Sequence, residues 1–147
     1  MPKHSVTGVH LWLILMKAFR AIGARASLDM KGSGLGQSDF QVLEVLLHKG
    51  PMPVNAIGPK VFLTPGSIST AVDRLYKKGL VTRKDCAEDR RIRTVDLTPK
   101  GRALITRIFQ THAARMEELA GILTPQEREA IANGLKKWGK KAEQPAG

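Results

Sequence analysis

Residues 63–80, LTPGSISTAVDRLYKKGL, constrain the fold most because they contain both ends and the buried face of one helix. Thr64 is a favourable N-cap, Pro65 suits the first helical position, and Gly79 ends the helix. Apolar side chains recur at i, i+3, i+4 and i+7 on one side, at Ile68, Ala71, Val72 and Leu75. The other side carries hydroxyl groups, which are only moderate helix formers. Some requirement other than helix stability must therefore favour small polar groups there.

The neighbouring segments predict a helix-turn-helix followed by a β-hairpin. Residues 54–62 hold an apolar pair at i and i+4, Ile57 and Val61, and very few residues separate them from the next helix. After this helix, apolar and polar residues alternate in LVTRKD (80–85) and in RTVDL (93–97), as in half-buried strands. The charged stretch CAEDRRI between them forms the hairpin tip. A helix-turn-helix with such a hairpin, or wing, is a winged helix.

Helical patterns also lie on both sides of this central region. Residues 6–28 are helical in pattern, and LWLILM (11–16) is apolar on nearly every side. A helix that is apolar all round must be covered all round, and in a chain this short a second copy of the chain is the expected cover. The apolar run is only six residues long and is followed by Lys17, so it predicts neither a membrane span nor an export signal.

Two further helix starts are expected from capping boxes, in which a hydroxyl residue is followed three positions later by Glu or Gln. Ser38 and Gln41 predict one such box before an apolar run. Thr124 and Glu127 predict another at the start of the last helix. The chain of 147 residues is thus expected to be one domain, mainly α with a small β-hairpin wing.

Composition points to an acidic partner and away from enzymatic chemistry. Lys and Arg total 24 against 13 Asp and Glu, so the net charge is +11, which suits a partner rich in phosphate or acidic lipid. The alternative is a basic surface that merely keeps the chain in solution. The 4 histidines show no metal-ligand spacing, and no phosphate-binding or nucleophile motif appears. We therefore expect no cofactor, no metal and no enzymatic activity.

The single cysteine, Cys86, excludes an internal disulfide and suits a reducing cytoplasm. Arg83 and Lys84 lie nearby and would favour a reactive thiolate. A structural or incidental thiol is the alternative.

The open face of the helix at 63–80 is suited to the DNA major groove. At about 100° per residue, a stripe opposite the apolar side holds Ser67, Thr70, Arg74 and Lys77, with Ser69 at its flank. Small hydroxyls allow close approach to a groove about 12 Å wide, where Ser, Thr and Arg reach base edges or phosphates. Free N–H groups at the helix start, beside Thr64, favour a phosphate. The alternative is an ordinary solvated face.

The wing predicts a second DNA contact. Arg90, Arg91 and Arg93 lie at or beside the hairpin tip, where they can enter a narrow minor groove, and Asp89 would orient an arginine. The alternative is a charged hairpin that discourages edge pairing. Because helix and wing are adjacent, double-stranded DNA is the favoured partner.

Residues 63–101 resemble the MarR family of bacterial transcription regulators. They contain the patterns V-D-R-L-x-x-K-G-L-V-x-R and D-x-R-x5-L-T-x-x-G, and the order of helices is similar over residues 6–139. The resemblance implies a homodimer with dimerisation helices at 6–30 and 102–139, a winged-helix DNA-binding lobe at 37–101 and a frayed tail at 140–147. It places base-reading positions and a minor-groove arginine with its carboxylate support at Ser67, Ser69, Thr70, Arg74, Arg91 and Asp89.

Family members commonly bind small aromatic or phenolic compounds in a crevice between the dimer helices and the DNA lobe. The resemblance makes aromatic and Met residues candidates to line it: Trp12, Met16, Phe19, Phe40, Phe109 and His112. Each has the alternative of an ordinary core residue. The thiol-switched branch of the family has a cysteine near its N-terminus, which this chain lacks, so peroxide sensing is disfavoured.

These observations favour a cytoplasmic, sequence-specific DNA-binding transcription regulator without a membrane partner. We expect a homodimeric repressor that a small aromatic or phenolic ligand releases from a pseudo-palindromic operator. One alternative is a sequence-tolerant architectural DNA-binding protein, for which a charge of +11 would suffice. Another is a winged helix that binds an acidic protein.

Overall fold

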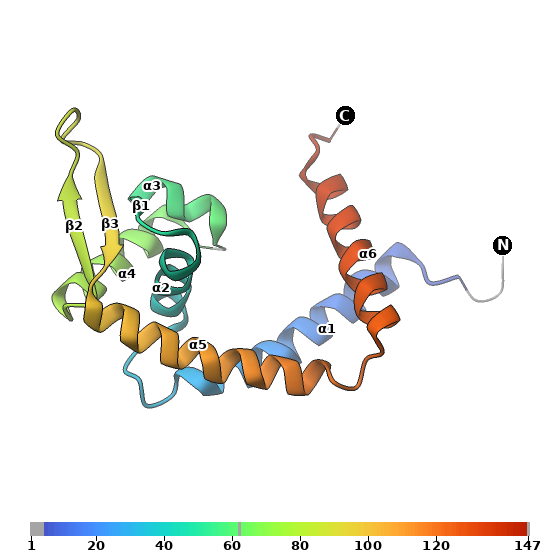
Figure 1. Ribbon diagram of the computed structural model, residues 1–147. Helices are drawn as coiled ribbons and strands as arrows, with labels where there is room; N and C mark the ends of the chain where they lie inside the picture. The colour runs from blue at the N-terminus through green and yellow to red at the C-terminus, as the bar shows by residue number, and fades with distance from the viewer. Residues whose placement is uncertain (1–4, 62, 147) are drawn as a thin grey trace. The chain divides into compact units, whose positions relative to one another are not determined.

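The computed structural model describes residues 5–61 and 63–146. Its elements, in chain order, are α1 (Gly8–Ser27), η1 (Leu28–Met30), α2 (Gln37–Lys49), β1 (Met52–Pro53), α3 (Val54–Ile57), η2 (Gly58–Lys60), α4 (Pro65–Lys77), β2 (Val81–Asp85), β3 (Arg93–Leu97), α5 (Pro99–Ala120) and α6 (Pro125–Glu143) (Figure 1). They form two compact units, Met1–His112 and Ala113–Gly147. The predicted fold class, mainly α with a small hairpin wing, is confirmed. Phe62, at the end of the helix expected over 54–62, lies outside the described residues.

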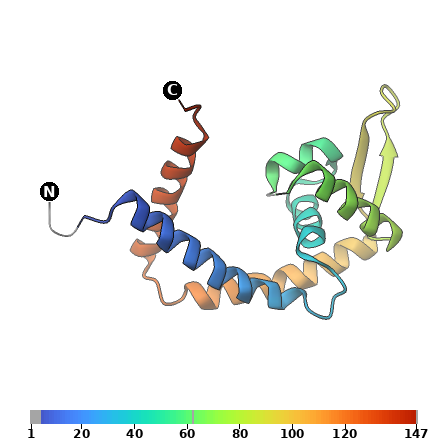
Figure 2. The same cartoon turned by 180° about the vertical axis from the view of Figure 1, so that it is seen from behind.

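The core of the first unit lies in the winged-helix lobe, where α2, α3, α4 and the sheet pack together. Its largest fully buried side chains include Leu43 and Leu46 of α2, Ile57 of α3 and Leu75 of α4. All four apolar positions predicted for α4 are buried. The reverse view shows α4 crossing the lobe beside the hairpin, whose tip projects beyond the helices (Figure 2). The core therefore fixes one face of α4 and leaves the other open.

The ends of α4 follow the residues that predicted them. The Thr64 side chain accepts a hydrogen bond of 3.2 Å from the Ser67 N–H. Gly79 has φ of 73°, a left-handed conformation that glycine adopts without steric cost, and the Leu80 N–H returns to the Leu75 carbonyl at 2.9 Å. The predicted boundaries of this helix are confirmed.

The predicted capping box of α2 is wrong. The helix begins at Gln37 with Gly36 as its N-cap, so Ser38 lies inside the first turn. Asp39, at the third helical position, accepts a hydrogen bond from the Gly36 N–H at 3.2 Å. The Asp39 carboxylate, at the third helical position, thus caps a helix start that lies two residues before the predicted N-cap Ser38.

The wing is part of a three-stranded antiparallel sheet with the order β1-β3-β2. Strands β2 and β3 pair from Val81 opposite Leu97 to Asp85 opposite Arg93, as the alternating pattern predicted. The third strand, β1, pairs Met52 with Val95 and was not predicted, because two residues show no periodicity.

The terminal helices bury far less. Neither α1 nor α6 contains a buried residue, and α5 buries Gly101, Ile105 and Ile108 in its first half. The capping box at the start of α6 is confirmed: the Thr124 N–H donates to Glu127 at 2.9 Å and the Glu127 N–H to Thr124 at 3.1 Å. This helix continues to Glu143, beyond the expected end at 139. Within the described part of the chain, no helix is long and apolar enough to cross a membrane.

Candidate nucleic-acid interface

The open face of α4 presents the predicted polar side chains together. The exposed residues of this face are Thr64, Ser67, Ser69, Thr70, Arg74 and Lys77. The Thr64 hydroxyl donates to Ser67 Oγ at 2.9 Å, and the Thr70 hydroxyl donates to the Gly66 carbonyl at 2.9 Å. These bonds are local to the helix, so they orient the hydroxyls without covering them. The face remains open to a ligand that approaches the helix closely.

The wing tip holds one arginine in a solvent-facing position beside Asp89. The Arg91 backbone N–H and Nε donate to Asp89 Oδ1 at 3.0 and 3.1 Å, and its Nη2 donates to Asp89 Oδ2 at 3.2 Å. The Arg91 side chain nevertheless remains 91% exposed. Hydrogen bonds from the Arg91 side chain, and then from its backbone, lower the pKa of Asp89 below its ordinary value. The ionised Asp89 carboxylate is therefore favoured, and it holds the Arg91 side chain at the wing tip.

The base of the wing is fastened to α4 by Arg83. Its guanidinium forms an ion pair with Asp73 and lies over the Tyr76 ring, 4.1 Å from the ring centroid. The sequence indicated Arg83 only as a nearby cation. Its contacts show that it links the hairpin to the side of α4 that carries Asp73 and Tyr76.

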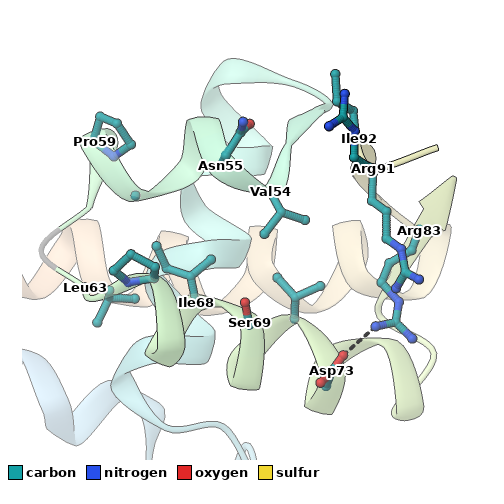
Figure 3. Close-up of a pocket in the computed structure, with 14 residues that line it drawn as sticks. Val54, Asn55, Pro59, Leu63, Ile68, Ser69, Asp73, Arg83, Arg91 and Ile92 are labelled. Atoms are coloured by element: carbon teal, nitrogen blue, oxygen red, sulfur yellow. Dashed lines mark hydrogen bonds and ion pairs between the residues drawn. The ribbon is translucent and has the colours of Figure 1, made fainter. Parts of the chain in front are cut away.

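Helix and wing face one hollow of about 780 Å³ (Figure 3). Its lining comes from α4, from the wing and from the α3–η2 segment, with apolar side chains at Val54, Leu63, Ile68, Val72 and Ile92. The polar lining comprises Asn55, Ser69, Asp73, Arg83, Arg91 and Arg93. The structure thus brings the predicted helix residue Ser69 and the predicted wing residues Arg91 and Arg93 to one concave surface. Asn55 was missed because nothing in its short helix distinguishes it in the sequence.

The cations of this surface differ in how strongly they are held. Arg93 pairs with Asp85 at 3.3 Å, and Arg74 pairs with Asp39 at 2.9 Å. By contrast, three cations have no side-chain hydrogen bond or ion pair within the described residues: Lys77, Lys84 and Arg90. These three can approach phosphates without first breaking a contact.

The predicted ligand-pocket residues fall into two groups. The rings of Phe40 and Phe109 lie 5.4 and 6.3 Å from that of His112, so three of the six predicted residues form one cluster. His48 joins it, 4.6 Å from Phe109, and His112 Nδ1 lies 3.6 Å from Asp29. Sequence analysis missed these last two residues because neither stands in a recognisable motif.

The other predicted pocket residues lie on α1. Trp12, Met16 and Phe19 are exposed there, with Phe19 74% exposed. Among the described residues, no ring contact joins Trp12 or Phe19 to the cluster around His112.

Comparisons with known proteins agree with this geometry. The family model described as "MarR family" matches residues 35–92. The HTH-type transcriptional regulator MhqR of Bacillus subtilis is 38% identical over 134 residues, which cover 91% of this chain and 92% of MhqR. The solved structure of AbsC, a MarR family transcriptional regulator from Streptomyces coelicolor, has a TM-score of 0.82 at 19% identity and covers 95% of this chain and 98% of its own.

A second solved structure is that of BpsR from Bordetella bronchiseptica, whose DNA binding is regulated by 6-hydroxynicotinic acid. It has a TM-score of 0.72 at 25% identity and covers 85% of this chain and 98% of its own. MhqR and AbsC are transcription regulators. The chain has a winged helix, and it is similar to MhqR over nearly the whole length of both proteins. It therefore belongs to the MarR family of DNA-binding transcription regulators and is not an enzyme.

Proposed function

We propose that the chain is a homodimeric repressor that binds a pseudo-palindromic operator and that a small aromatic or phenolic ligand releases. The observation that carries the DNA-binding part is the hollow shared by α4 and the wing, which is rimmed by Ser69, Arg91 and Arg93. One rigid lobe thereby offers hydroxyl groups for base edges and cations for phosphates on the same side. The net charge of +11 supports the same partner.

Each predicted residue other than Arg74, which is treated separately below, has a role in this proposal. The hydroxyls of Ser67, Ser69 and Thr70 reach base edges in the major groove, because short side chains let the helix axis approach closely. Thr64 and Lys77 lie at the two ends of α4 and bind backbone phosphates. Arg91, held by Asp89, enters the adjacent minor groove, and Arg90 and Arg93 bind the phosphates on either side.

The homodimer is proposed from the apolar surface of α1. Large side chains on nearly every side of this helix are exposed in the single chain, among them Leu11, Trp12, Ile14, Phe19 and Ile22. Contiguous apolar surface of this kind marks a protein interface. We assign residues 6–30 and 102–139 to the contact with a second copy, and residues 37–101 to one DNA half-site. Two-fold symmetry then requires half-sites spaced by about 34–36 Å or a multiple of that distance.

Ligand release is proposed from the cluster around His112. Phe40 and Phe109 supply ring faces, and the His112–Asp29 pair supplies a polar partner for a hydroxyl or ring nitrogen. Trp12, Met16 and Phe19 of α1 complete the proposed lining. The response of BpsR to 6-hydroxynicotinic acid supports a small aromatic ligand for this chain. DNA and ligand would then oppose each other with a reciprocal coupling of about 1–3 kcal/mol.

The test begins with a random pool of duplex DNA, from which the purified protein selects its preferred sites. Fluorescence anisotropy then compares the selected duplex with a scrambled duplex of equal length at several salt concentrations. We expect a preference of about 10³-fold or more, and release of the selected duplex by small phenols or aromatic acids. Equal binding to both duplexes, lost together as salt rises, would contradict the proposal and favour an architectural protein. No measurable binding to either would favour the acidic protein partner.

A further inference from the structure

Arg74 lies on the open face of α4, but its guanidinium forms an ion pair with Asp39 at the start of α2. Its Nε and Nη2 donate to Asp39 Oδ1 at 3.2 and 2.9 Å. The Asp39 side chain is only 3% exposed, whereas that of Arg74 is 46% exposed. The second Asp39 oxygen accepts the hydrogen bond from the Gly36 N–H that caps α2. Both oxygens of one buried carboxylate are thus occupied, one by α4 and one by the start of α2.

A buried carboxylate of this kind depends on its cation. Within the described residues, Arg74 is the only cation within ion-pair distance of Asp39. If the guanidinium turned towards a base, Asp39 would be left charged and nearly without water, which is strongly unfavourable. The contact with Asp39 therefore opposes any reorientation of Arg74 towards DNA.

A second contact ties the same end of α4 to the same segment. The Lys78 ammonium donates to the Gly34 carbonyl at 2.7 Å, in the loop that leads into α2. Together, Arg74 and Lys78 set the position of α4 against residues 34–39. Lys77, next to Lys78 on the open face, has no such partner within the described residues. Lys78 therefore holds α4 in place, whereas Lys77 is available to a ligand.

We infer that Arg74 is a positioning residue, which supports sequence recognition by fixing α4 to the start of α2 through Asp39 and not by contacting a base. This inference rests on the proposed function, because it concerns how DNA sequence is discriminated. It assigns Asp39, which lies beneath the surface and cannot reach DNA, a role in specificity. It also removes Arg74 from the residues that would read a base directly.

The test is a double-mutant cycle of Arg74→Gln and Asp39→Asn, measured on the selected and the scrambled duplex. We expect each single variant to lower the ratio of the two affinities about tenfold, which is the size of one lost base contact. The double variant should be no worse than either single one, because both remove the same linkage. The slope of log affinity against log salt should stay unchanged, since no phosphate contact is lost. Arg74→Lys, which keeps a charge beside Asp39, should restore part of the ratio.

Lys77→Gln is the matched control, since Lys77 lies on the same face without a partner. It should weaken binding to both duplexes and reduce the salt slope by about 0.9, leaving the ratio unchanged. Circular dichroism sets a temperature at which every variant is folded. A smaller folded fraction would in any case lower both affinities equally and leave their ratio unchanged. Where Arg74→Gln does not fold, Arg74→Lys replaces it in the cycle.

Three results would overturn the inference while the proposed function stands. Asp39→Asn could leave the ratio intact or raise it while Arg74→Gln lowers it, which would show that Arg74 reads a base. Arg74→Gln could reduce the salt slope by about 0.9, which would show a phosphate contact. The ratio could also stay constant in both variants, which would leave the pair a purely structural role. A wild-type protein without any preference would instead refute the proposed function, and this inference with it.

Discussion

The winged-helix lobe buries its large apolar side chains, whereas the N-terminal helix α1 leaves its own exposed. In the lobe, Leu43, Leu46 and Leu75 have no exposed surface at all. On α1, Trp12 remains 54% exposed and Phe19 74%. The two regions have similar kinds of residues, so the difference lies in what surrounds them within one chain. The lobe has its own core, whereas α1 lacks one.

This difference separates two kinds of stability. The lobe buries its apolar surface within the chain, so its unfolding should not depend on protein concentration. The order of α1 and α6 should instead depend on association, because binding partners stabilise only the state that they bind. In the proposed dimer, a ligand that acts on the helices would therefore change the relation between the two lobes without unfolding either one.

The largest effect that we expect is that of Gly101→Ala, at the start of α5. A Cβ there would lie far inside contact distance of the Leu80 carbonyl oxygen, a backbone atom that cannot turn aside as a flexible side chain could. We expect the lobe to lose about 4 kcal/mol of unfolding free energy, measured by urea denaturation.

Gly134→Ala in α6 is the matched control, because nothing lies within 4 Å of the position that an added Cβ would take. It should stabilise the helix by about 0.5–1 kcal/mol, since alanine is the better helix former. If the two substitutions lowered the unfolding free energy equally, α6 would be as closely packed as the lobe. The difference in packing between the lobe and the terminal helices would then not hold.

The contrast also explains which features could be predicted from the sequence. The helix at Pro65–Lys77 and its hairpin were predictable because Thr64, Gly79 and the change of period are local features. The strand Met52–Pro53 is too short to show any period. The role of Asp39 depends on Arg74, 35 positions away, and no local pattern reports such a contact. Gly101 ends the quoted L-T-x-x-G pattern, but that pattern does not report how closely the Leu80 backbone approaches it.

The next largest effect should come from a charge placed on α1. Ile14→Glu introduces a carboxylate into the surface that we assign to the second copy, where an unpaired charge would be buried on association. We expect the dimer to weaken by about 3 kcal/mol, observed as a shift to monomer in sedimentation equilibrium. The lobe itself should unfold as before.

Lys17→Gln provides the comparison on the same helix, since it changes a charge without placing one in an apolar surface. The dimer should persist in this variant. A dimer that tolerates Ile14→Glu would show that something other than a second copy covers α1. The stability of α1 would then not depend on dimerisation.

The smallest effects compare two threonines that cap helices in the two regions. Thr64 accepts from the Ser67 N–H at 3.2 Å, and Thr124 accepts from the Glu127 N–H at 3.1 Å. Each Thr→Ala substitution should cost its helix about 1 kcal/mol. In the monomeric Ile14→Glu background, Thr64→Ala should lower the global unfolding free energy, because α4 carries four buried core residues.

In the same background, Thr124→Ala should leave global unfolding nearly unchanged and instead speed hydrogen exchange in the first turn of α6, a helix that buries none of its residues. The corresponding Thr→Ser variants keep a hydroxyl cap and should resemble the parent in both assays. If Thr124→Ala lowered global unfolding as much as Thr64→Ala, then α6 would fold together with the lobe even in the monomer. Ligand control would then have to act through one cooperative unit and not through helices that order only when two copies meet.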